Sequence, residues 1–124
     1  LEDRVVFQGI LEKQPQFCRA AVVQEGENET VVGYLFAHMH DKDAPPPALG
    51  RPLHEFPENG DIFIHDMSLL QDYRRKGVGK LWLSELSKNG LALALVAVQD
   101  ASQVWTKCGF FPVSSGEGQG YGKD

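Results

Sequence analysis

Cysteine and long apolar runs are scarce in this sequence. The only two cysteines, Cys18 and Cys108, stand far apart, with no further pair at metal-ligand spacing. Neither a disulfide scaffold nor a zinc site is therefore indicated. The apolar run 91–98 has the length of a buried strand and falls well short of a membrane span, and no basic-then-apolar signal segment opens the chain. We expect reduced thiols, a cytoplasmic location and no membrane partner.

Positive charge is also in short supply. The 12 lysines and arginines face 17 aspartates and glutamates, which gives a net charge of -5. This balance argues against non-specific electrostatic binding to the phosphate backbone of nucleic acid, so we expect no nucleic-acid partner. A cluster of basic residues in this chain would therefore indicate a site at that position, not a property of the whole surface.

Length and composition indicate one domain over residues 1–124. The 124 residues, 42% of them hydrophobic, suffice for one core, and no internal repeat is visible. The chain begins at Leu1 without a methionine and stops soon after the glycine-rich run 114–122, which we interpret as a loop. The sequence leaves open that the first and last elements of the domain are missing.

The order of predicted elements indicates an α+β fold. Apolar periodicity predicts helices over residues 3–14, 78–86 and 101–107. Strands are predicted for residues 17–24, 30–38, 61–70 and 91–98, where β-branched, aromatic or continuous apolar residues gather. Prolines predict a long loop over residues 41–60. This order contains one strand–helix–strand crossover.

A segment rich in arginine and glycine marks the junction between a predicted strand and a helix. Gly77 and Gly79 would let backbone amides approach a ligand closely, and the unpaired N–H groups and dipole of a helix N-terminus favour an anion. Four cations surround this junction: Arg74, Arg75, Lys76 and Lys80. We therefore predict a phosphorylated ligand. Dinucleotide and Walker motifs do not fit, because Trp82 replaces a third glycine and Leu81 follows Lys80.

The same segment resembles the signature of the GNAT superfamily of N-acetyltransferases, Gln/Arg-x-x-Gly-x-Gly/Ala. Arg74, Gly77 and Gly79 match its three fixed positions, and residues 67–73 are similar to the strand and "Asp-Tyr-Arg" approach before it. Downstream, residues 101–110 are similar to the short helix that closes in Lys-x-Gly-Phe. The resemblance covers about half the chain. It implies a GNAT-like mixed, mostly antiparallel, twisted sheet with a splayed central strand pair and flanking helices.

The resemblance also implies acetyl-CoA as co-substrate and no metal. Pantetheine would lie between the strands 61–70 and 91–98 and bond to their backbone, as an added strand does, with Leu69 and Leu70 offering backbone groups. Trp105 would be a wall against pantetheine, or plain core. The implied pyrophosphate contacts are Arg74, Arg75, Lys76, Gly77, Val78, Gly79 and Lys80. A primary amine of a small molecule or a peptide would attack the thioester directly, and a homodimer is left open.

Candidates for acid–base chemistry differ in strength. Direct attack needs a base for the amine and an acid for the thiolate. His65 and Asp66 fall on the presumed bulged strand, where His65 titrates in the useful range and Asp66 could orient it or bind the ammonium. Alternatively, one of the two only bonds backbone at the sheet edge. Where the family carries a thiolate-protonating tyrosine, this chain has Trp105, so Tyr121, Tyr73, Cys108 or water would supply that proton.

Three further interpretations remain beside these. His38, His40 and Asp41 could suggest a metal site, but a histidine pair at a strand end is the simpler interpretation. Because the helix tyrosine is missing, the chain could be a GNAT-like module that binds CoA without turnover. A regulatory domain that docks a partner through its proline-rich loop is the third, and it predicts an exposed apolar patch there.

Overall fold

The computed structural model describes residues 4–47, 55–96, 102–114 and 119–123. Its helices are α1 (Arg4–Lys13), α2 (Val78–Ser87) and α3 (Ser102–Lys107), with 3-10 turns η1 (Pro15–Phe17) and η2 (Gln71–Tyr73). Its strands are β1 (Arg19–Glu25), β2 (Asn28–His40), β3 (Asp61–Leu69), β4 (Leu93–Val96), β5 (Phe111–Ser114) and β6 (Gln119–Lys123). None of the described helices is long and apolar enough to cross a membrane.

The strands form one mixed sheet in the order β1-β2-β3-β4-β6-β5. All neighbouring strands are antiparallel except β3 and β4, which are parallel. The parallel pair is joined by α2, as a strand–helix–strand crossover requires. The predicted α+β class and mostly antiparallel sheet are confirmed.

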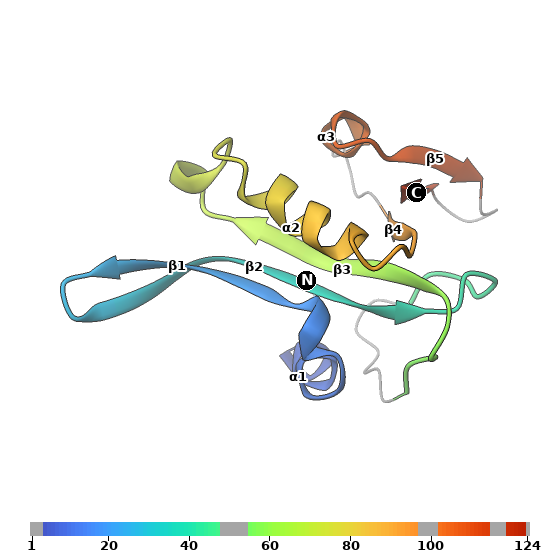
Figure 1. The fold of residues 1–124 in the computed structure, drawn as a ribbon, viewed down its shortest axis with the longest axis horizontal. Coiled ribbons are helices and arrows are strands. Elements are labelled where there is room, and N and C mark those ends of the chain that lie inside the picture. Colours follow the sequence, from blue (N-terminus) through green and yellow to red (C-terminus); the bar gives the residue numbers. More distant parts are fainter. Residues whose placement is uncertain (1–3, 48–54, 97–101, 115–118, 124) are drawn as a thin grey trace.

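Helices cover both faces of the sheet (Figure 1), with α1 on one face and α2 on the other. In α1, Val6 and Ile10 lie one helical turn apart and are fully buried, and the helix ends before Pro15. The apolar stripe of α2 packs on the opposite face, where most of the core lies. That core consists of Phe17, Leu35, Ala37, Met39, Ile62, Ile64, Trp82, Leu83, Leu86, Leu93, Leu95 and Phe110.

The two parallel strands separate soon after they meet. Only Ile62 with Leu93 and Phe63 with Ala94 are paired across this junction, although β3 continues to Leu69 and β4 to Val96. Over the rest of its length β3 is paired with β2 alone among the described strands. The predicted splayed central pair is therefore confirmed.

A β-bulge interrupts the pairing of β2 with β3. Ala37 pairs with Ile64 and Phe36 with Asp66, so His65 is the extra residue of β3. A bulge lets two consecutive residues project to similar sides of a sheet. Here His65 reaches the ring of Phe7 in α1, and Asp66 reaches Tyr34 on the same face. The presumed bulge at His65 and Asp66 is present.

The prediction that the glycine-rich C-terminal run forms a loop is wrong for part of it. Residues 119–123 form β6, which pairs with β4 on one side and β5 on the other. Two neighbouring strands satisfy its backbone groups, and this pairing outweighs the low strand propensity of glycine. Residues 115–118 lie outside the described part of the chain.

Other boundaries shift by a few residues. The first strand begins at Arg19 rather than Phe17, because Pro15–Phe17 form a 3-10 turn. The strand predicted over 91–98 is observed over Leu93–Val96, and positions 97 and 98 are not described. Residues 41–47 and 55–60 are irregular, as predicted for the long loop, and residues 48–54 are not described.

Candidate functional site

The N-terminus of α2 carries the arginine-glycine segment. Gly77 is its N-cap residue, with φ 85° and ψ 4°, and no side chain caps the helix. The Leu81 N–H is bonded to the Gly77 carbonyl at 2.9 Å, as in a regular first turn. The N–H groups of Val78, Gly79 and Lys80 come before that bond and therefore have no carbonyl within the helix to bind. They form the positive end of the helix.

The space in front of Gly77 is open. A Cβ atom at this position would meet no atom within 4 Å. Arg75, Lys76 and Lys80 are exposed around it, and the Lys76 ammonium lies 5.7 Å from the centre of the Tyr73 ring. Open space, helix N–H groups and three cations together suit a diphosphate.

Arg74 plays a different part from its basic neighbours. Its Nε donates to the Leu69 carbonyl at 2.8 Å, which ties the segment to the end of β3. The Leu70 N–H donates to Val32 O at 2.9 Å, and the Leu70 carbonyl accepts from Tyr73 N at 2.9 Å. The predicted Leu70 contact with pantetheine would therefore involve a residue whose N–H and C=O already bond within the chain.

The bulge of β3 brings His65 and Asp66 onto the face that α1 covers. His65 Nδ1 lies 3.1 Å from His38 Nε2, and His38 Nδ1 lies 2.9 Å from the Met39 carbonyl. The Tyr34 hydroxyl donates to Asp66 Oδ2 at 3.0 Å. Sequence reasoning did not find Tyr34 or the contact of His38 with His65. The alternation of Tyr34, Phe36, His38 and His40 along β2 was the available signal.

The surroundings of these groups set their protonation. Burial lowers the pKa of His38 to about 4, and the neighbouring His65 and His40 lower it further, against a smaller opposing effect of the Met39 hydrogen bond. Burial, then the charge of Asp66 and the hydrogen bond to it, raise the pKa of Tyr34. At neutral pH, His38 is thus uncharged, and Tyr34 keeps the proton that it donates to Asp66.

The remaining histidine of β2 is engaged in the loop that follows it. His40 Nε2 lies 2.9 Å from the Pro45 carbonyl, and Asp41 Oδ1 accepts from the Asp43 N–H at 2.9 Å. Within the described residues, no group of three or more His, Cys, Asp or Glu side chains could hold a metal ion. These contacts favour the simpler interpretation of the histidine pair.

The candidates for thiolate protonation come from separate elements: Tyr73 from η2, Cys108 from the turn after α3 and Tyr121 from β6. Trp105 is half-buried, packs against the core and meets Phe110 edge to face, with ring centres 5.5 Å apart. Tyr121 lies in β6, in register with Leu95 of β4 and Pro112 of β5. Its side chain is outside the described part, so the predicted acid role of Tyr121 stays a prediction.

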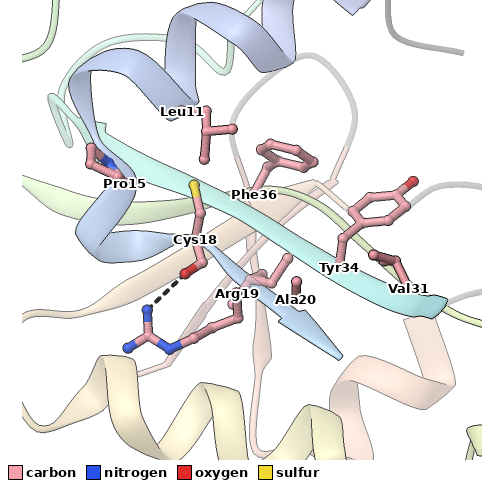
Figure 2. Close-up of a pocket in the computed structure, with 9 residues that line it drawn as sticks. Leu11, Pro15, Cys18, Arg19, Ala20, Val31, Tyr34 and Phe36 are labelled. Carbon is pink, nitrogen blue, oxygen red and sulfur yellow. Dashed lines mark hydrogen bonds between the residues drawn. The ribbon is translucent and has the colours of Figure 1, made fainter. Parts of the chain in front are cut away.

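An apolar hollow lies between α1, η1 and the β1–β2 hairpin (Figure 2), and the sequence did not predict it. It has a volume of about 460 Å³ and is lined by Leu11, Pro15, Cys18, Arg19, Ala20, Val31, Tyr34, Leu35 and Phe36. Burial raises the pKa of the Cys18 thiol, so this thiol is uncharged at neutral pH. Tyr34 connects the hollow with the catalytic candidates, because its hydroxyl bonds to Asp66.

Solved structures share this fold at low sequence identity. The chain is similar to the Bacillus subtilis N-acetyltransferase YlbP in complex with coenzyme A, with TM-score 0.58 and 12% identity over 82% of this chain and 64% of YlbP. It is also similar to Arabidopsis thaliana Naa50 in complex with the bisubstrate analogue CoA-Ac-MVNAL, with TM-score 0.60 and 15% identity over 97% and 78% of the two chains. The NatB acetyltransferase complex bound to CoA and MES gives TM-score 0.63 and 17% identity over 94% and 76%.

The family of the chain follows from its sequence as well as its fold. Comparison with curated proteins gives no match, and the chain spans 64% of the length of YlbP. Residues 2–110, however, match the Acetyltransferase (GNAT) family, and this match includes the splayed strands, the α2 N-terminus and the bulge. The chain therefore belongs to the GNAT acetyltransferase family.

Proposed function

We propose that this protein is an acetyl-CoA-dependent N-acetyltransferase in which a primary amine attacks the thioester directly. The observation that carries the proposal is the uncapped N-terminus of α2, which is joined through the turn η2 to the end of β3, the strand that splays from β4. That arrangement offers backbone groups for an extended chain and, next to them, an anion site. The CoA complexes of similar folds, YlbP among them, support the assignment.

The cofactor would be held by the residues that line this junction. Val78, Gly79 and Lys80 offer N–H groups to the pyrophosphate, with Arg75 and Lys76 beside them. Arg74 acts indirectly, since its bond to the Leu69 carbonyl fixes the course of the segment. Pantetheine would form hydrogen bonds to the part of β3 that is no longer paired with β4. Trp105 would border the pantetheine.

His65 and Asp66 divide the work on the amine. Asp66 holds the incoming ammonium, because a carboxylate accepts several hydrogen bonds and Tyr34 occupies only one of its oxygens. The ammonium loses its first proton to water. The neutral amine nitrogen then forms a bond to the acetyl carbon, the C–S bond breaks, and His65 takes the second proton that the nitrogen loses. The thiolate leaves and takes a proton from water or from Tyr121, since a thiol is only weakly basic near neutral pH.

The acceptor is an amine of a small molecule or a peptide. Naa50, one of the similar folds, was solved with a CoA–peptide analogue, which supports a peptide amine as one candidate. The apolar hollow beside Tyr34 would suit an acceptor that carries an apolar group.

A second candidate function is CoA binding without turnover. Trp105 favours it, because indole cannot protonate a thiolate as the family's tyrosine does. Tight CoA binding with no acetylation of any amine would support this alternative.

The test measures thiol release from acetyl-CoA across a panel of peptides with a free amino terminus and small primary amines. Gly77→Asp is the decisive variant, since its carboxylate would enter the open space at the helix N-terminus and repel the diphosphate. We expect a roughly tenfold or larger loss of acetyl-CoA affinity, equivalent to about 1.4 kcal/mol or more.

Gly77→Asn is the matched control. Asn has nearly the same shape as Asp and, like Asp, tolerates the left-handed region, but it carries no charge. It should lose clearly less affinity than Gly77→Asp. Equal, unimpaired acetyl-CoA binding by both variants would overturn the pyrophosphate assignment.

A further inference from the structure

His38 is fully buried and lies beside His65, the proposed base. The proposed reaction gives His38 no role of its own. It is 1% exposed, and its ring packs against those of Phe56 and Phe63, with centres 5.3 Å and 5.6 Å away. The groups that titrate next to it are His40 and His65. A polar group at this depth needs a defined set of hydrogen bonds.

One proton position on His38 follows from its backbone partner. Its Nδ1 lies 2.9 Å from the Met39 carbonyl, and a carbonyl oxygen can only accept. Nδ1 therefore carries a hydrogen. Since His38 is neutral at the pH of most enzymes, its Nε2 carries none and can only accept.

The accepting Nε2 of His38 also fixes a proton position on His65. Its Nδ1 lies 3.1 Å from that accepting Nε2, so Nδ1 of His65 must donate. If Nδ1 of His65 had no hydrogen, two lone pairs would face each other at this distance. The hydrogen bond on one imidazole nitrogen decides which tautomer the ring adopts.

We infer that His38 is a positioning residue that holds neutral His65 in the Nδ1–H tautomer, so that Nε2 of His65 is the atom that takes the proton of the amine. The inference rests on the proposed function of His65. When Nε2 gains the proton, Nδ1 still donates to His38, so the pair need not rearrange during the reaction. His38 does not accept the proton in turn, because its own burial disfavours a charge.

The pairing of β2 with β3 makes this contact. His38 pairs with Phe63, and alternate residues of a strand share a face, so His65 lies on the same face as His38. The bulge at His65 then brings Asp66 onto this face as well, in register with Phe36.

The test reads the tautomer directly, from two-bond proton–nitrogen spectra of the histidine side chains in the full ¹⁵N-labelled chain at neutral pH. We expect His65 of the wild type to carry its hydrogen on Nδ1. His38→Phe keeps a ring but removes the acceptor, so His65 should become a mixture of both tautomers. His38→Gln offers an amide oxygen in reach of His65 and should restore the Nδ1–H form.

His40→Gln is the matched control. It changes a histidine on the same face that bonds to Pro45 O, and it should leave the tautomer of His65 unchanged. An Nε2–H form of His65 in the wild type would overturn the inference, even if the His38 variants failed to fold. So would an unchanged Nδ1–H tautomer in a folded His38→Phe.

Kinetics separate this inference from the proposed function. If the protein transfers acetyl groups, His38→Phe should lower kcat roughly tenfold, part of the 10²- to 10⁴-fold that a general base contributes, with KM for acetyl-CoA unchanged. His38→Gln should recover most of this loss. A confirmed tautomer with no turnover on any amine would sink the proposed function and leave the role of His38 in fixing His65 intact.

Discussion

At the scale of single residues, His38 couples the site to the stability of the fold. It is buried in its neutral form, so its pKa falls from the ordinary 6.5 to about 4 on folding. The unfolded chain therefore binds the proton more readily than the folded chain. The resulting stabilisation is fully present above about pH 6.5 and is lost as the pH falls towards 4.

We predict that this loss can be isolated by urea unfolding of the wild type and His38→Gln between pH 7.5 and 4. The free energy of unfolding of the wild type should decrease over this range by about 3 kcal/mol more than that of the variant. Subtracting the two curves removes the carboxylates that titrate in both proteins. Parallel curves would show that His38 is not held neutral.

The residues of the site were predictable to different degrees. Gly77, Gly79 and the cations around them could be chosen as candidates because the features of a helix N-terminus that suit an anion lie in a short stretch of sequence. His65 and Asp66 were found through the resemblance to GNAT proteins. The partners Tyr34 and His38 were missed, because they come from another strand and meet Asp66 and His65 only through the pairing of β2 with β3.

At the scale of secondary-structure elements, the close approach of β2 and β3 depends on Gly33. A Cβ atom here would lie 2.9 Å from the Ser68 carbonyl oxygen and would collide with the side chain of Leu69. Gly33 pairs with Leu69, the last residue of β3, so the clash falls where β3 turns towards α2.

Gly33→Ala should therefore destabilise the protein by about 1–3 kcal/mol, the usual cost of an overpacked site. Gly79→Ala is the comparison, because a Cβ there would lie an ordinary 3.5 Å from the Met67 methyl group. It should be neutral or stabilising by up to about 1 kcal/mol through helix propensity. Urea midpoints measure both changes, and equal stability of the two variants would contradict the argument.

Most elements followed from local patterns, and the exceptions have a common cause. The helices and the first strands show apolar spacing that needs no distant partner to be recognised. The strand β6 shows none, because glycine supplies no side-chain pattern and its strand state depends on β4 and β5 at its sides. Pro15 was recognised as the end of α1, but the 3-10 turn after it moved the start of β1 to Arg19.

At the scale of the whole molecule, the two faces of the sheet carry different tasks. The α2 face holds most of the apolar core, while the α1 face carries His38, His40, His65, Tyr34 and Asp66. The overall charge is -5, yet the α2 N-terminus is surrounded by Arg75, Lys76 and Lys80. A polyanionic ligand is thus attracted to one end of an otherwise acidic protein.

The splay of β3 from β4 also determines which backbone amides exchange their hydrogens with solvent. Beyond Phe63, the edge of β3 that faces β4 has no strand partner among the described residues, so we expect the amides on this edge to exchange faster than those paired with β2. We predict that saturating CoA slows deuterium uptake in peptides covering 64–69 and 77–81, while the β1–β2 hairpin keeps its rate. Uniform slowing across the chain would indicate general stabilisation instead, and no slowing in 64–69 would mean that the ligand does not lie between the strands.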